Sequence, residues 1–460
     1  MLDHDASSRG KRISWRSRVI SSRGCPSPAT GRAGRELDGA GRDRAQSRGI
    51  AGPAALAVVL CGLLPAVTTG AVASTLVINA DTSNPAPRAA WEATIEAFQA
   101  EHPDIQVSFN VYDHESYKRS IRNWLTGASP DVVYWFVGNR MRQFVVPGLL
   151  EDVSDVFTPQ VKEQMGKVAL DLVTVDGKQY GMPYTYYHWG MYYRRDLFAA
   201  AGVEAPPASW SELLAACEKL KGRGLEPIAI GTKNLWPAAG WFDYLDLRLN
   251  GYGFHMELMS GQVPYTDERV IAVFDKWREL IDRGCFAAHH VGMSWQEAQA
   301  LLYQGKSAMM LIGNFITPNF PPELADRMDF FPFPEITPGI GAYEEAPMNS
   351  VHIPVRARNK EDARKFLAFV ARADVQERIN EALLQIPVNR DAKVVPDRFI
   401  VPGKQLLDQA DALAQFFDRD TDEDLATVAM KGFQEFMVKP DRLEGILENI
   451  ERARQRIYGS

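Results

Sequence analysis

Cysteine and histidine are scarce in this chain, and none of them is spaced as a metal site requires. The 460 residues include four cysteines and eight histidines. Only Cys217 and Cys285 follow residue 73, and the sequence alone cannot place their Cα atoms within disulfide reach, so we expect two buried free thiols. His289 and His290 are neighbours without further ligands at metal-site spacing. We therefore expect no metal and no cofactor.

Long apolar runs are also few, and the clearest one lies near the N-terminus. An uncharged run begins at Ile50, contains Pro65 and ends in the small-residue pattern Ala71-Val-Ala73 before Ser74. This pattern is typical of a secretory signal peptide, which we place at residues 50–73. Residues 1–49 contain eleven Lys or Arg and little apolar surface, so we expect a disordered basic leader or a mis-assigned translation start.

A lipid anchor is not expected. Cys61 lies midway through the apolar run and follows Leu60, whereas a lipoprotein signal needs a small residue directly before its cysteine. Pro65 and the cleavage pattern also argue against a permanent membrane span. We expect a periplasmic protein without membrane insertion after signal cleavage.

Beyond the leader, acidic residues outnumber basic residues. Residues 1–73 hold 11 of the 51 basic and 5 of the 58 acidic residues, which leaves a net charge of −13 for the rest. An acidic protein is a poor partner for nucleic acid or an anionic membrane surface.

The 387 residues from Ser74 onward exceed what one hydrophobic core usually supports, so we expect two domains. Strand-like runs at 76–79, 105–111 and 131–135 alternate with helical patterns at 88–102 and 116–125. This order predicts a parallel sheet covered by helices, with ligands beyond the strand ends at 79–83 and 135–140.

The stretch 181–198 carries six tyrosines and tryptophans and no helical period. We expect an extended segment that crosses between the domains. Tyr184, Tyr186 and Tyr187 are then candidates for ligand contact, with Tyr186 and Tyr187 competing for one face, whereas Tyr192 and Tyr193 belong to the core.

Six segments occur in an order that is typical of one family: FQAEHPDIQV at 98–107, PDVVYW at 130–135, GKQYGMP at 177–183, YYRRDLFAAAGV at 192–203, PPASWSEL at 206–213 and QGKSAMMLIGNF at 304–315. Together they resemble the extracellular solute-binding proteins (family 1) of ABC-type sugar importers, the group that contains maltose-binding protein. The resemblance covers residues 75–458.

The resemblance implies an α/β, two-lobed periplasmic-binding-protein fold (class II type) with a cleft between the lobes and several hinge crossings. Lobe 1 would comprise 74–185 and about 348–375, and lobe 2 would comprise 186–347 and about 376–460. It also implies a monomer that delivers a carbohydrate to a membrane permease. The candidate ligand-binding residues are Asp81, Trp135, Asn139, Tyr186, Tyr187, Trp241, Asn314, Phe315, Asn349, Asp418 and Arg419.

Aromatic rings suit the apolar faces of a sugar, and Asn, Asp and Arg suit its hydroxyls. Gly138 stands where the family has an acidic residue, so the positions make no case for maltose itself. Whether the ligand is a monosaccharide, an oligosaccharide or a polyol stays open. An anionic ligand would use Arg140, Arg142 and Arg419.

Two other classes of function stay open. A secreted carbohydrate-active enzyme would need two carboxylates across the scissile bond, for which Asp243 and Asp418 could be proposed. Neither has a recognisable acid/base context, so we expect no enzyme and no catalytic residue. A binding protein for a non-sugar solute, or one that reports to a membrane sensor, would use the same cleft.

Overall fold

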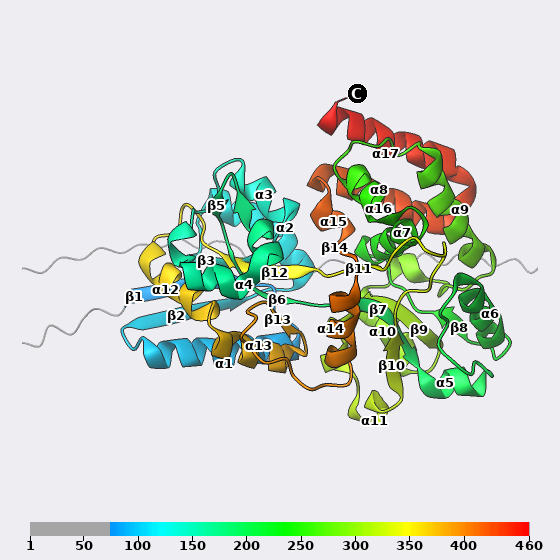
Figure 1. Cartoon of the computed structure of the whole chain (residues 1–460), viewed down its shortest axis with the longest axis horizontal. Coiled ribbons are helices and arrows are strands. Elements are labelled where there is room, and N and C mark those ends of the chain that lie inside the picture. Colours follow the sequence, from blue (N-terminus) through cyan, green and yellow to red (C-terminus); the bar gives the residue numbers. More distant parts are fainter. Residues whose placement is uncertain (1–73, 460) are drawn as a thin grey trace, which may run out of the picture. The chain divides into compact units, whose positions relative to one another are not determined.

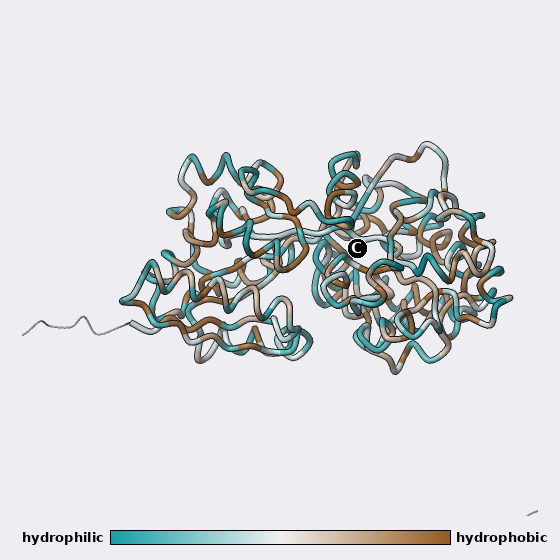
Figure 2. Tube along the Cα trace, turned by 90° about the horizontal axis from the view of Figure 1, so that it is seen from below, coloured by the Kyte–Doolittle hydropathy of each residue, from teal (hydrophilic) through white to brown (hydrophobic). Residues whose placement is uncertain are grey.

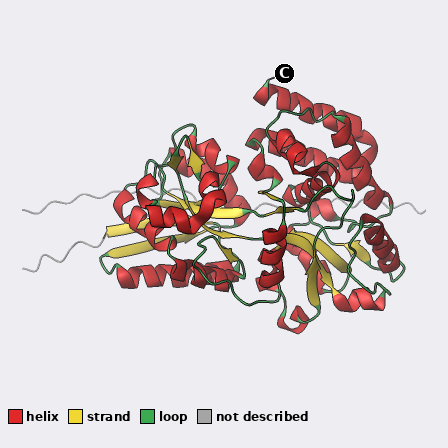
Figure 3. Ribbon diagram, viewed as in Figure 1, coloured by secondary structure: helices red, strands yellow, loops and turns green. Residues whose placement is uncertain are grey.

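The computed structural model describes residues 74–459, which form two lobes of mixed helices and strands (Figure 1, Figure 3). Along the tube of Figure 2, hydrophobic and hydrophilic stretches alternate within the elements of each lobe. None of the helices in this range is long and apolar enough to cross a membrane. The predictions for the leader, the signal peptide and Cys61 fall outside the described residues.

The first lobe is built on a six-stranded sheet with the order β13-β6-β12-β3-β1-β2. β1 pairs in parallel with β2 and β3, whereas β12 runs antiparallel to β3 and β6. The predicted β-α-β-α-β order is thus present, and a distant segment returns to complete the sheet. The strands are β1 (Ser74–Ala80), β2 (Ile105–Val111), β3 (Val132–Phe136), β6 (Met182–Tyr186), β12 (Met348–His352) and β13 (Ile386–Pro387).

The helices of the first lobe cover this sheet. Asp113 caps the start of α2 by accepting a hydrogen bond from the amide of Ser116. α13 packs along α1, and Ile379 and Val388 belong to the core of this lobe. The return segment therefore extends beyond the predicted limit near residue 375. The helices are α1 (Pro85–Glu101), α2 (His114–Thr126), α3 (Asn139–Val145), α4 (Pro159–Leu172), α12 (Lys360–Val370) and α13 (Ala373–Leu383).

The second lobe is built on a four-stranded sheet with the order β10-β7-β9-β8. β7 runs antiparallel to both of its neighbours, and β8 pairs in parallel with β9. Its core holds Cys217 and Cys285, both buried and free. The strands are β7 (Trp189–Arg194), β8 (Glu226–Ile228), β9 (Ser307–Gly313) and β10 (Met328–Phe331).

Most of the helices belong to the second lobe. Ser209 and Glu212 form a capping box at the start of α6. The helices are α5 (Arg195–Ala200), α6 (Trp210–Lys221), α7 (Trp236–Leu249), α8 (Gly251–Met259), α9 (Glu268–Asp282), α10 (Trp295–Tyr303), α11 (Pro322–Ala325), α14 (Ile400–Gln409), α15 (Phe417–Asp420), α16 (Glu423–Val438) and α17 (Leu443–Tyr458). Two short ribbons pair β4 (Thr174–Val175) with β5 (Lys178–Gln179), and β11 (Tyr343–Glu345) with β14 (Ala412–Ala414).

The stretch 181–198 is extended as far as Arg194, as predicted, but its last residues begin α5 and its extended part is divided between the two sheets. β6 belongs to the first sheet and β7 to the second, with Tyr187 and His188 between them. Tyr192 and Tyr193 are buried in the second core, which confirms their structural assignment.

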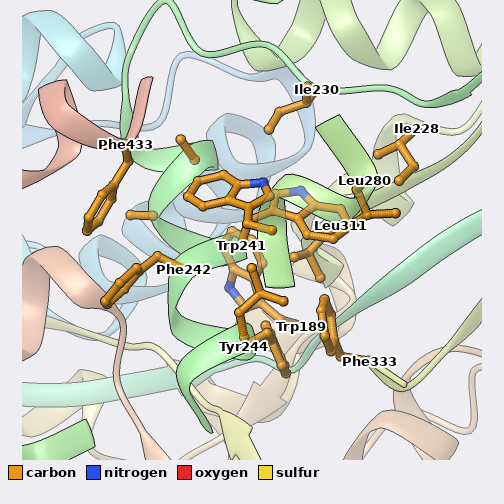
Figure 4. Close-up of a cluster of buried hydrophobic side chains, with 14 of the residues drawn as sticks. Trp189, Ile228, Ile230, Trp241, Phe242, Tyr244, Leu280, Leu311, Phe333 and Phe433 are labelled. Atoms are coloured by element: carbon orange, nitrogen blue, oxygen red, sulfur yellow. The ribbon is translucent and has the colours of Figure 1, made fainter. Parts of the chain in front are cut away.

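Trp241 lies in the second core, which corrects its assignment as a ligand contact. It is fully buried on α7, with its ring centroid 5.0 Å from that of Phe286 and 5.6 Å from that of Phe333. Ile230 and Leu311 lie around the same indole (Figure 4). Every residue of α7 from Trp236 to Arg248 is buried, so this helix has no solvent-facing side from which Trp241 could reach a ligand.

Replacement of Trp241 by alanine should therefore lower the free energy of unfolding by about 3–5 kcal/mol, because a large core side chain is lost. Denaturant unfolding followed by circular dichroism measures this change. Val168→Ala is the control, since Val168 is 60% exposed and its loss should change stability by less than about 0.5 kcal/mol. Equal stabilities of Trp241→Ala and the wild type would contradict the core assignment.

Gly231 lies where the starts of α7 and α10 approach each other. A Cβ atom at this position would contact the carbonyl oxygen of Ser294 and lie 2.8 Å from that of Met293. Both obstacles are backbone atoms, so the clash can be relieved only by displacing the chain.

Gly231→Ala should cost about 1–3 kcal/mol of stability, measured by thermal or denaturant unfolding. Gly253→Ala is the matched control, because nothing lies within 4 Å of its added Cβ and alanine favours the helix α8 by up to about 1 kcal/mol. A Gly231→Ala variant that matches Gly253→Ala would contradict the close approach.

Candidate functional site

A cavity of about 180 Å³ lies where the loops of the two sheets meet. The first lobe contributes the β1–α1 and β2–α2 connections and the end of β3. The second lobe contributes the starts of α7 and α10 and the residues after β9. The remaining walls come from the segments that cross between the sheets, including the segment 416–419.

Aromatic side chains dominate the lining. Phe315, directly after β9, lies near the centre of this group: its ring centroid is 5.3 Å from that of Trp295, 5.5 Å from that of Tyr187 and 6.2 Å from that of Trp236. The ring planes of each pair are steeply inclined, so ring edges and faces both occur in the wall. The full aromatic lining is Trp91, Phe136, Tyr184, Tyr187, Trp189, Trp236, Trp295, Phe315 and Phe416.

Arg419 holds several of these walls together. Its Nη2 donates to the hydroxyl of Tyr187 (3.1 Å), and its Nη1 donates to Asn349 Oδ1 (3.2 Å) and to the carbonyl of Met348 (3.1 Å). The guanidinium carbon lies 4.0 Å from the ring centroid of Phe136. The charge of Arg419 is therefore used mainly within the protein, by hydrogen bonds and a cation–π contact.

Two other acidic groups of the lining lie in pairs, and a third, Asp113, accepts hydrogen bonds at the start of α2. His114 Nδ1 lies 2.7 Å from Asp81 Oδ2, and Lys118 Nζ lies 3.3 Å from Asp418 Oδ2. Burial by itself raises the pKa of Asp418, but the charges of Lys118, Arg140 and Arg419 outweigh it and hold this pKa at about 2. Asp418 is thus ionised throughout the physiological pH range.

Six of the eleven predicted site residues line the cavity. They come from five separate parts of the chain and are Asp81, Tyr187, Phe315, Asn349, Asp418 and Arg419. Tyr184, which was also a candidate, lines it too.

Trp135 and Tyr186 do not line the cavity, and Trp135 points away from it because strand neighbours point to opposite faces of a sheet. The indole of Trp135 donates to the carbonyl of Arg140 (2.8 Å), and the next residue, Phe136, faces the cavity instead. Tyr186 packs against the hydrophobic clusters of the first lobe, and its neighbour Tyr187 takes the cavity position.

Asn139, Asn314 and Trp241 are also absent from the lining. Asn139 Nδ2 donates to the carbonyl of Asp420 (2.6 Å), and Asn314 Nδ2 donates to that of Leu384 (2.6 Å). Both asparagines therefore join backbone segments. Trp241 lies in the second core, as described above.

Sequence reasoning missed several lining residues. Trp236 and Trp295 each stand at the first position of a helix, directly after a connecting loop, and this position was the available signal for them. His114 and Lys118 occupy successive turns of α2 on one face, four residues apart. Trp189 follows the crossing segment, and nothing in its sequence context distinguishes it from an aromatic residue of the core.

Most candidate residues of the alternative ligands and chemistry lie outside the cavity, with Asp418 and Arg419 as the exceptions. Asp243 does not line the cavity, so it cannot form a carboxylate pair with Asp418 across a bound substrate. Arg140 and Arg142 do not line it either, and Arg140 pairs with Glu423 at 3.4 Å. Within residues 74–459, no cluster of three or more His, Cys, Asp or Glu could hold a metal ion.

Comparison with known proteins agrees with this architecture. The chain is 29% identical to the bacterial solute receptor AcbH, with a TM-score of 0.80 over 84% of this chain and all of that one. AcbH is described as having an exclusive preference for β-D-galactopyranose. A chitin oligosaccharide binding protein shares the fold, with a TM-score of 0.75 and 20% identity over 84% of this chain and 98% of that one.

Among sequence relatives, an ABC transporter extracellular-binding protein of Pyrococcus horikoshii is 25% identical over 321 residues, which cover 67% of this chain and 70% of that protein. The osmoprotective compounds-binding protein GgtB of Synechocystis is 23% identical over 63% of this chain and 71% of its own length. The family model for bacterial extracellular solute-binding proteins matches residues 80–377. The chain belongs to this family and is a solute-binding component of an ABC transporter.

Proposed function

We propose that this protein binds a neutral sugar, a single pyranose ring, in the cavity and delivers it to a membrane permease from the periplasm as a monomer. The aromatic lining carries this proposal. A pyranose has apolar C–H faces and an equator of hydroxyl groups, so it suits a cavity with many rings and a few polar groups.

The charge of the lining supports a neutral ligand. Asp81 and Asp418 are matched by His114 and Lys118 at short range, and Arg419 is engaged by protein acceptors. An anion or a cation would have to break one of these pairs and leave a partly buried charge without its partner, which is costly. Hydroxyl groups can instead donate to the carboxylates and accept from the cations without disrupting them.

The size of the cavity supports one sugar ring. At about 30 Å³ per water, a volume of about 180 Å³ corresponds to roughly six waters, which favours a small solute over an oligosaccharide. The preference described for AcbH, which spans the same length of chain, points to the same class of ligand.

We further infer that the bound sugar leaves chemically unchanged. Glycoside hydrolysis needs one carboxyl group that can donate a proton and a second on the opposite side of the bond. Asp418 is held ionised by its three cationic neighbours, and Asp81 is paired with His114. Product analysis after incubation with disaccharides tests this inference, and the appearance of free monosaccharides would contradict it.

A thermal-shift screen tests the class of ligand. D-galactose and other hexoses should raise the unfolding midpoint, because a ligand at 100 times its Kd stabilises the folded state by about 2.7 kcal/mol. Maltotriose and chitotriose serve as comparison ligands that exceed the cavity, and phosphate esters and polyamines serve as charged ones. A shift by the charged compounds alone would refute the proposal.

Asp81→Asn should weaken the binding of the best hexose about tenfold to hundredfold, because hydrogen bonds to a charged acceptor contribute about 1.5–3 kcal/mol. Isothermal titration calorimetry measures the Kd. Asp104→Asn is the matched control, since Asp104 is exposed in the turn before β2 and does not line the cavity. Unchanged binding by Asp81→Asn would exclude Asp81 as a ligand contact.

A further inference from the structure

Three buried carboxylate oxygens near the cavity wall lack a hydrogen-bond donor. They are Asp243 Oδ1 and both side-chain oxygens of Glu345. Both side chains are fully buried, on the contacting elements α7 and β11, and each carboxyl group is among the neighbours that shift the pKa of the other. Two adjacent carboxylates without solvent cannot both remain ionised, because burial and mutual repulsion oppose the second charge.

The surrounding charges do not neutralise this pair. His255 Nδ1 is 2.9 Å from Asp246 Oδ2, whereas its Nε2 is 4.0 Å from Asp243 Oδ1. The imidazole is therefore mainly the partner of Asp246. Asp420 faces the pair from α15 and adds further negative charge.

The cations nearby are committed elsewhere. Arg248, on the same helix as Asp243, pairs with Glu344 at 2.5 Å, and the hydroxyl of Tyr244 donates to the same carboxylate at 3.0 Å. Arg419 is held by the crossing segments. A proton is the donor that would satisfy the orphaned oxygens.

We propose that Glu345 carries a proton which it donates to Asp243, and that this bridge positions the cavity wall formed by residues 416–419. Asp243 Oδ2 accepts from the amide of Phe417 at 2.6 Å, so the pair fixes the start of α15. Phe416, Asp418 and Arg419 of this segment line the cavity. Asp243 and Glu345 are thus positioning residues and do not touch the ligand.

The bridge also ties this wall to the second crossing, the segment 345–349 that leads from β11 to β12. Directly after Glu345, the amide of Ala346 donates to the carbonyl of Ala414 (2.8 Å). The side chain of Gln415 donates to the carbonyl of Ala346 (3.1 Å) and accepts from the amide of Met348 (3.1 Å). One proton therefore links α7, the segment 414–419 and the strand that carries Asn349 to the cavity.

The direction of the pKa shifts agrees with this geometry. Burial raises the pKa of Glu345 far above its usual range and raises that of Asp243 as well. Burial lowers the pKa of His255, but its hydrogen bond to Asp246 and the charges of Asp243 and Asp246 outweigh this effect and raise it to about 8. In each case the folded protein keeps a proton that the unfolded chain releases, so stability falls as the pH rises through the folded pKa.

A window from pH 6.5 to 8 avoids the titration of the other buried histidines. Burial lowers the pKa of His188 to about 3 and of His352 to about 4, and it lowers that of His290, so these three histidines change stability only below the unfolded value near 6.5. Asp418, with a pKa of about 2, contributes a change only in acid.

The test measures how the thermal unfolding midpoint of the ligand-free protein changes between pH 6.5 and 8. This measurement does not depend on the identity of the solute. The wild type should lose stability as the pH rises. Glu345→Gln places a permanent amide donor against Asp243 and should lose less than half as much. Glu335→Gln, which changes an exposed glutamate, should behave as the wild type does. A flat wild-type profile, or equal losses in the wild type and Glu345→Gln, would overturn the proposal.

Two further measurements cover the case in which Glu345→Gln fails to fold. In Asp243→Asn the new amide donates and the carboxylate of Glu345 accepts. This variant should therefore also lose less stability than the wild type as the pH rises. Infrared spectra of the wild type at pH 6.5 should show the carbonyl stretch of a protonated carboxyl group, although free Asp and Glu side chains are ionised there. Absence of this band would overturn the proposal without any variant.

Discussion

The guanidinium of Arg419 is the contact on which the cavity depends. It joins the first crossing, through the hydroxyl of Tyr187, to the second crossing, through Met348 and Asn349. It also covers the ring of Phe136 at the end of β3. A single planar group with several fixed donors can bridge segments in this way, and a lysine cannot reproduce that geometry.

Around this contact, most polar groups of the lining lie in local pairs, and Asp113 adds one further carboxylate. Lys118 and Asp418 face each other across the lining, and so do His114 and Asp81. The behaviour of the acids depends on whether a cation is within reach. Asp418 stays ionised because three cations surround it, whereas Asp243 and Glu345 lack a committed cation and share a proton in our proposal.

The order of elements in the first lobe could be read from the sequence because each element carries a local signal. The alternation of strands and helices over 74–136 follows from periodicity. In the second lobe, the capping box at Ser209 and Glu212 likewise marks the start of α6. The family motifs placed the crossing near residue 187 and the return strand near 349, both of which line the cavity.

The orientation of individual side chains was much harder to predict. At Trp135–Phe136 adjacent residues of β3 point to opposite faces, and at Tyr186–Tyr187 the chain leaves β6. In both places a shift of one residue exchanges cavity and core. Trp241 resembled a stacking aromatic, but α7 is enclosed on all sides by other helices and the sheet. Nothing local distinguishes such a helix from one with an open face.

The sequence by itself determined the family, the two-lobed fold, the scarcity of metal ligands and the aromatic character of the ligand-facing segments, since these depend on composition, motif order and periodicity. Only the tertiary structure decided which aromatics face the cavity, that His114 and Lys118 reach it, and that Asp243 meets Glu345. Lys118 and Asp418, for example, are 300 positions apart, and Asp243 and Glu345 are about a hundred apart. Such long-range pairings leave no local pattern in the chain.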